Sequence, residues 1–102
     1  MEQMLFVDAI IGAARKHGYR VDQNRDGKRQ IVFKNKNLTD DDLRWLFQDI
    51  KRRKGVYTRA DIEELILGRP CAVKPFFELA VQVNLCDKLT EGRKKIYRFK
   101  LD

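Results

Sequence analysis

The sequence predicts a single α+β domain, built from helices with clear start signals and from two short β-hairpins. Four segments carry apolar residues at helical spacing, and two stretches alternate apolar with polar residues around a glycine turn. The 102 residues are 43% hydrophobic, which is enough for one core without disulfides or a structural metal. We expect helices over residues 2–17, 39–54, 58–67 and 72–85, and hairpins over residues 19–34 and 85–101.

The first hairpin is centred on Arg25-Asp26-Gly27, and two registers are possible for it. A two-residue loop would pair Val21 with Val32, whereas a three-residue loop with a left-handed Gly27 would pair Val21 with Ile31. We prefer the second register because it places apolar side chains opposite one another on one face of the hairpin.

The helices at 39–54 and 58–67 have the strongest start signals in the chain. Thr39 is followed three residues later by Asp42, and Thr58 by Asp61, so each pair can form a capping box. The first of these helices ends in a basic run that suits the negative end of the helix dipole. We expect Gly68 to end the second in a left-handed conformation.

A short turn joins the helix at 58–67 to the next one. Gly68-Arg69-Pro70 has the length and the glycine that a helix-turn-helix uses. The helix at 72–85 has Pro75 within its first turn, where the missing N–H costs little.

The C-terminal hairpin is strongly basic. We expect Glu91-Gly92 at its turn, and in the return strand Tyr97 and Phe99 alternate with basic residues. Residues 93–95 add three cations near the tip. Such a hairpin either contacts a polyanion or is an edge whose lysines protect it from aggregation.

The order of these elements resembles the winged helix-turn-helix superfamily. The resemblance covers residues 39–101 and rests on element order and turn chemistry. It implies a winged-helix core over residues 37–102 and an N-terminal extension, residues 1–36, that docks on it as a helix and a hairpin. In that scheme 39–54 and 58–67 are the first two helices, Val56-Tyr57 a small strand, 72–85 the recognition helix and 86–101 the wing.

This resemblance implies a double-stranded DNA-binding protein, regulatory in transcription or in a phage or mobile-element process. The 22 basic and 15 acidic residues give a net charge of +7, which favours a polyanionic partner. Recognition helices dock by their N-terminal part, and a wing lies along phosphates. The expected DNA-binding residues are Arg69, Lys74, Gln82, Arg93, Lys94, Lys95 and Arg98.

A second apolar stripe on the helix at 72–85 supports an alternative. Phe77, Val81 and Leu85 lie beside its polar stripe, so either the N-terminal extension covers them or they bind a partner protein or a second copy. Trp45 lies on the polar side of its helix and is either covered by the N-terminal helix or an interface anchor. The alternative function is a winged-helix protein–protein interaction module, or a small inhibitor of a nucleic-acid-handling protein.

Catalysis, metal binding and membrane insertion are not expected. No nucleophile–base pair, carboxylate pair or Gly-rich phosphate loop has useful spacing, so we expect neither an enzyme nor a cofactor. Cys71 and Cys86 lack metal-ligand spacing, and they flank one helix too far apart for a disulfide. No apolar run approaches the roughly 20 residues that span a bilayer, and no signal peptide is recognisable. We therefore expect a cytoplasmic or nucleoid-associated protein.

Overall fold

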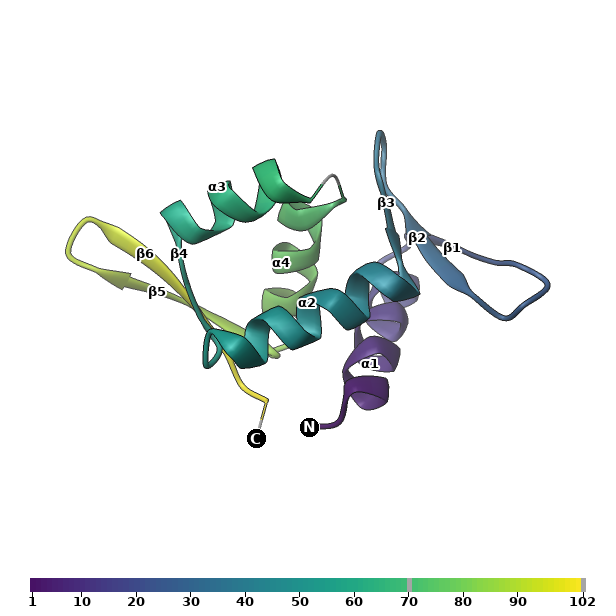
Figure 1. Ribbon diagram of the computed structural model, residues 1–102, viewed down its shortest axis with the longest axis horizontal. Helices are drawn as coiled ribbons and strands as arrows, with labels where there is room; N and C mark the ends of the chain where they lie inside the picture. Colours follow the sequence, from purple (N-terminus) through teal and green to yellow (C-terminus); the bar gives the residue numbers. More distant parts are fainter. Residues whose placement is uncertain (70, 102) are drawn as a thin grey trace.

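The computed structural model describes residues 1–69 and 71–101, and within them the chain is an α+β fold of four helices and two antiparallel three-stranded sheets. The sheets lie at opposite ends of the long axis, and each sends a hairpin outward from the helices (Figure 1). The amino group of Met1 donates a hydrogen bond to the carbonyl oxygen of Leu101, so the two ends of the fold are adjacent. The elements are α1 (Gln3–Lys16), β1 (Arg20–Gln23), β2 (Arg29–Val32), β3 (Asn37–Thr39), α2 (Asp40–Arg52), β4 (Val56–Thr58), α3 (Arg59–Gly68), α4 (Val73–Gln82), β5 (Cys86–Glu91) and β6 (Lys94–Phe99).

The first sheet has the order β1-β2-β3, and its hairpin has the preferred register. Val21 pairs with Ile31, and Gly27 has a φ of 81°, as a left-handed loop position requires. β3 was not expected from the sequence. Its Leu38 is fully buried opposite Ile31, so tertiary packing makes a strand of a segment too short to show an alternating pattern.

Both expected capping boxes are present. The hydroxyl of Thr39 accepts from the backbone N–H of Asp42 at 3.1 Å, and the Asp42 carboxylate accepts from the N–H of Thr39 at 3.0 Å. Thr58 and Asp61 repeat the arrangement at 3.2 and 3.0 Å. These local bonds satisfy N–H groups that a helix start leaves without a partner, which confirms the predicted helix starts.

Two helix ends differ from expectation. Gly68 is the last residue of α3 and does not have a positive φ, so it is not a left-handed stop. α4 ends at Gln82 rather than at residue 85, because Asn84 takes a φ of 62° and the N–H of Leu85 bonds to the carbonyl of Ala80 at 2.9 Å. This is the Schellman closure, in which Asn is the commonest substitute for Gly. Pro70, expected in the turn between α3 and α4, lies outside the described residues.

The second sheet has the order β4-β6-β5. The short strand β4 pairs with β6, placing Tyr57 opposite Tyr97. The hairpin turn is Gly92-Arg93, one residue later than expected, because Glu91 still pairs with Lys94. A positive φ at Gly92 alone matches a type II′ turn, which has glycine at its first central position.

α4 is packed between α1 and the second sheet, so Phe77 of its second apolar stripe is covered, but by a different element than the N-terminal extension that we expected. Phe77 is 3% exposed, and its ring lies 5.2 Å from that of Tyr57, 5.4 Å from Tyr97 and 5.5 Å from Phe99. Its cover is therefore the C-terminal sheet and not the N-terminal extension. α1 meets the other side of α4, where Phe6 packs on Phe76 with ring centroids 6.0 Å apart.

Candidate nucleic-acid interface

The β5–β6 hairpin extends from the body of the molecule (Figure 1). It carries exposed cations along its length. Its tip residue Arg93 and the neighbouring Lys94 and Lys95 are exposed, as is Arg98 further along β6. Among the residues that the structure describes, none of these four cations forms an ion pair. Their charges are therefore available to an external anion.

The two faces of the hairpin differ in charge balance. Side chains alternate along a strand, so Lys95 shares its face with Tyr97 and Phe99, which pack toward α4. Lys94 and Arg98 lie on the outer face, where the strand pairing places Glu91 opposite Lys94 and Asp87 opposite Arg98. The positive charge on the face directed at the helices is therefore less balanced by neighbouring carboxylates than the positive charge on the outer face.

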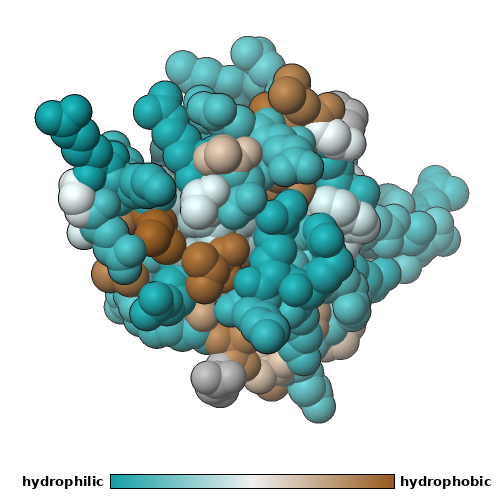
Figure 2. All heavy atoms as spheres, turned by 60° about the vertical axis from the view of Figure 1, so that its left-hand side comes forward, coloured by the Kyte–Doolittle hydropathy of each residue, from teal (hydrophilic) through white to brown (hydrophobic). Residues whose placement is uncertain are grey.

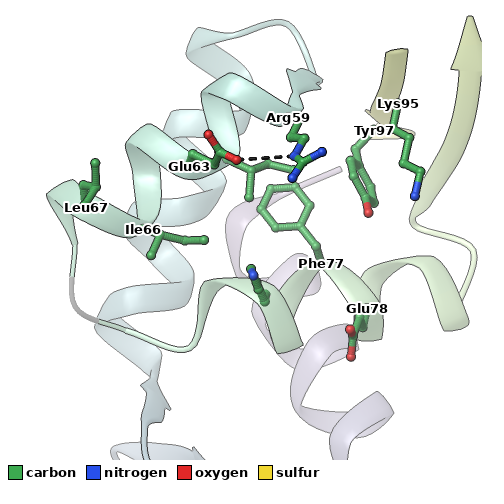
Figure 3. A pocket seen from close by; sticks show the side chains of 10 residues that line it. Arg59, Glu63, Ile66, Leu67, Phe77, Glu78, Lys95 and Tyr97 are labelled. Atoms are coloured by element: carbon green, nitrogen blue, oxygen red, sulfur yellow. Dashed lines mark hydrogen bonds and ion pairs between the residues drawn. The ribbon is translucent and has the colours of Figure 1, made fainter. Parts of the chain in front are cut away.

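A groove of about 530 Å³ lies between this face of the hairpin and the helices α3 and α4 (Figure 3). Phe77 and Tyr97 form part of its apolar lining, and Lys95 extends beside Tyr97 (Figure 3). The helices add two cations, Arg59 from the start of α3 and Lys74 from the start of α4. Seen from the hairpin side, the surface is mainly hydrophilic, with small apolar areas between the polar side chains (Figure 2).

Two carboxylates limit what this groove can bind. Glu63 accepts from Arg59 Nε at 3.3 Å, so one cation is already partly neutralised. Glu78 is exposed on α4 and lines the groove, and it forms no ion pair within the described parts of the chain. A negative charge in the middle of α4 disfavours a close approach of that helix to DNA along its whole length.

Arg69 lies where the sequence predicted, at the end of α3, but its guanidinium is held within the molecule. Nη2 donates to Asp42 Oδ1 at 3.2 Å, and the guanidinium carbon lies 4.4 Å above the ring of Trp45. Its Nε is buried without a hydrogen-bond partner among the described residues. Arg69 thus joins the α3–α4 turn to α2, and it is the least accessible of the expected DNA-binding cations.

Lys74 and Gln82 are both exposed on α4 but occupy opposite ends of it. Eight residues at 1.5 Å per residue separate them by about 12 Å along the helix axis. The two side chains therefore cannot contact the same base pair, and of the two only Lys74 lines the groove.

The expected protein-interface residues do not form one exposed patch. Phe77 is buried, and Val81 and Leu85 are half-buried against the core. Trp45 is 38% exposed, and the guanidinium of Arg69 lies over its ring. Among these anchors, only Trp45 remains substantially accessible.

Arg59 was missed because a cation in the first turn of a helix is electrostatically disfavoured and gives no local sign of function. Its place in the groove follows from the β4–β6 pairing, which brings the start of α3 beside the hairpin. The available signal was the Thr58 cap, because it places Arg59 at the first position of α3, directly after the small strand expected at Val56-Tyr57.

The two cysteines are buried and free, and they lie outside the groove. Burial raises the pKa of both thiols, that of Cys86 to about 12. Across residues 1–69 and 71–101, no group of three His, Cys, Asp or Glu side chains is placed to hold a metal ion. In the same residues, no helix combines the length and apolarity needed to cross a membrane.

Comparisons of this chain with protein-family models, with curated proteins and with solved structures found no match.

Proposed function

We propose that this protein binds double-stranded DNA through phosphate contacts made by the β5–β6 hairpin, on a winged helix-turn-helix core formed by residues 39–101. The winged-helix assignment is supported by the order α2–β4–α3–α4–β5–β6 and by the pairing of the small strand β4 with the return strand β6. A regulatory role in transcription or in a phage or mobile-element process follows from the resemblance alone.

The observation that carries the DNA-binding proposal is the cluster of exposed cations at residues 93–95. Lys95 lines the α3–α4 groove, and all three residues line a neighbouring groove at the hairpin tip that the start of α3 also lines. None of the three forms an ion pair among the described residues. Phosphate contacts of this kind supply affinity without reading sequence. The ion pair of Arg69 with Asp42 and the charge of Glu78 argue for backbone contacts rather than extensive base contacts by α4.

The test is a salt titration of duplex binding by the wild type and by Arg93→Ala/Lys94→Ala/Lys95→Ala. Each phosphate contact contributes about 0.9 to the slope of log K against log salt, so the triple variant should flatten the slope by about three units at most. Lys16→Ala/Lys51→Ala/Lys54→Ala is the matched control, since it removes the same charge from exposed lysines outside these grooves. An unchanged slope in the wing variant would exclude the hairpin, and absence of duplex binding by the wild type would exclude the function.

A protein–protein interaction module remains the second candidate, and two exposed side chains favour it. Trp45 is 38% exposed, and Leu67 is 88% exposed at the edge of the α3–α4 groove. Aromatic and apolar side chains of this kind anchor protein interfaces. Binding to a protein through them would change little between 50 and 200 mM salt, whereas phosphate binding would weaken steeply.

A further inference from the structure

The loop between β2 and β3 forms a second basic groove against the start of α4. This groove, of about 410 Å³, is lined by Lys34 and Lys36 from the loop and by Lys74 from α4. Apolar residues such as Phe33 and Ala72 complete the lining, which contains no carboxylate among the described residues. The N-terminal extension thus brings two lysines beside a helix start more than thirty residues later in the chain.

This second groove is continuous with the surface next to the hairpin. Lys74 lines both the loop groove and the α3–α4 groove. Arg59 and Lys95 line both the α3–α4 groove and a third groove, of about 480 Å³, at the hairpin tip. We call the connected cations the basic track; it consists of Lys34, Lys36, Lys74, Arg59, Lys95, Lys94 and Arg93.

In the part of the chain that the structure describes, three cations of the N-terminal extension are held in ion pairs, whereas the two loop lysines are not. Arg20 bonds to Asp22 at 3.2 Å, Lys28 lies 3.8 Å from Asp41, and Arg29 bonds to Asp8 and Asp40. Lys34 and Lys36 are exposed and form no ion pair in the described residues. Arg15, Lys16 and Arg25 are likewise exposed without an ion pair in the described residues, so what distinguishes Lys34 and Lys36 is their place beside Lys74 at the start of α4.

We propose that Lys34 and Lys36 bind phosphates of the same duplex that the hairpin contacts, so that the N-terminal extension lengthens the DNA-binding surface on the far side of α4. This proposal rests on the proposed function. A row of separated cations without intervening carboxylates near the loop fits a repeating phosphate backbone better than a single small anion. Residues 1–36 then have two roles: α1 packs against α2 and α4, and the loop between β2 and β3 supplies two phosphate contacts.

The deciding experiment compares Lys34→Gln/Lys36→Gln with Lys51→Gln/Lys54→Gln on one random duplex over a range of salt. Lys51 and Lys54 are exposed and line a separate groove with Met1 and Leu101, which shares no lining residue with the basic track. Both variants lose two positive charges, and glutamine keeps most of the side-chain length. Thermal melts check that both variants are folded at the temperature of the binding assay, because Lys51 of the control variant also lies over the Phe47 ring, 5.0 Å from its centroid.

The loop variant should lower the salt slope by about 1.8 units, and the control variant should leave it unchanged. If the plots of log K against log salt for the loop variant and the wild type intersect near 1 M salt, the association constant of the loop variant at 0.1 M salt should be about 60-fold lower than that of the wild type. Equal changes in the loop and control variants would show an effect of net charge alone and overturn the proposal. A normal slope in the loop variant, with a reduced slope in the Arg93/Lys94/Lys95 variant, would overturn the extension of the track and leave hairpin binding intact. Absence of duplex binding by the wild type would overturn both.

Discussion

The hydroxyl of Tyr57 donates a 2.5 Å hydrogen bond to the carboxylate of Asp49, and both residues are buried. Asp49 belongs to α2 and Tyr57 to β4, so this bond fixes the small strand, and the hairpin paired with it, against the helices. Arg52 and Arg53 bond to the same carboxylate at 2.5 and 3.1 Å. The orientation of the proposed DNA-binding hairpin therefore depends on a buried polar contact far from its tip.

Tyr57→Phe should lower the free energy of unfolding by about 1.5–3 kcal/mol, because it removes a hydrogen bond to a charged, buried acceptor. Urea denaturation measures the change. Tyr19→Phe is the control, since Tyr19 is 38% exposed and its loss of a hydroxyl should stay within about 0.5 kcal/mol. Equal stabilities for Tyr57→Phe and wild type would mean that the Tyr57–Asp49 bond contributes nothing to the fold.

Stability should fall at acid pH through Asp49. Burial alone would raise its pKa, but hydrogen bonds from Tyr57, Arg52 and Arg53 bring the pKa below the ordinary value. A carboxyl with a lowered folded-state pKa stabilises the protein above its unfolded pKa of about 3.9, and this stability is lost as pH falls through the folded pKa. The stability difference between wild type and Asp49→Asn, from urea melts at pH 6 down to pH 2, should therefore shrink below about pH 4. A difference that does not vary with pH would contradict this assignment.

Thr39→Ala and Thr58→Ala should each cost about 1 kcal/mol, because each removes the hydroxyl of an observed capping box. Thr39→Ser and Thr58→Ser keep that hydroxyl and serve as matched controls in thermal melts. A loss in the serine variants as large as in the alanine variants would point to the methyl group, and not the cap, as the source of the effect.

Phe77→Ala should cost about 3–5 kcal/mol, as for other core phenylalanines, because its ring packs against Tyr57, Tyr97 and Phe99. Leu67→Ala, in the same groove but 88% exposed, should change stability by less than about 0.5 kcal/mol. Equilibrium unfolding and sedimentation of both variants measure stability and association. Loss of association without loss of stability in Phe77→Ala would show that the ring serves an interface instead of the core.

Glu78→Gln should tighten duplex binding about two- to fivefold at low salt, because it removes a negative charge from the groove that Lys74 and Lys95 line. Fluorescence anisotropy with a labelled duplex measures the change. Glu2→Gln also removes one negative charge, at the N-terminal end of α1 and outside this groove, and should have a smaller effect. If the two variants gain equally, DNA does not approach α4.

The helix starts, the first-hairpin register and the location of basic residues on the second hairpin were predictable from the sequence. Each depends on interactions over a few residues, such as the Thr58–Asp61 capping box or the left-handed Gly27. The same local chemistry explains one error, since Asn84 was not recognised as the left-handed residue that ends α4. Asp49 was also unremarkable in sequence, because its helical position alone places it on a polar side.

Tertiary structure decided which surfaces are covered and which charges remain available. Phe77 lies under the C-terminal sheet because β4 and β6 pair beside α4, a contact between segments about forty residues apart. The guanidinium of Arg69 is held by Asp42, which lies 27 residues earlier in the chain. Lys34 and Lys36 lie in one groove with Lys74, and within the described residues they form no ion pair. The sequence by itself determined the elements and the net positive charge, because caps, turns and composition act locally or additively. The packing of distant segments determined where that charge is exposed, because charge partners and burial depend on which elements meet in space.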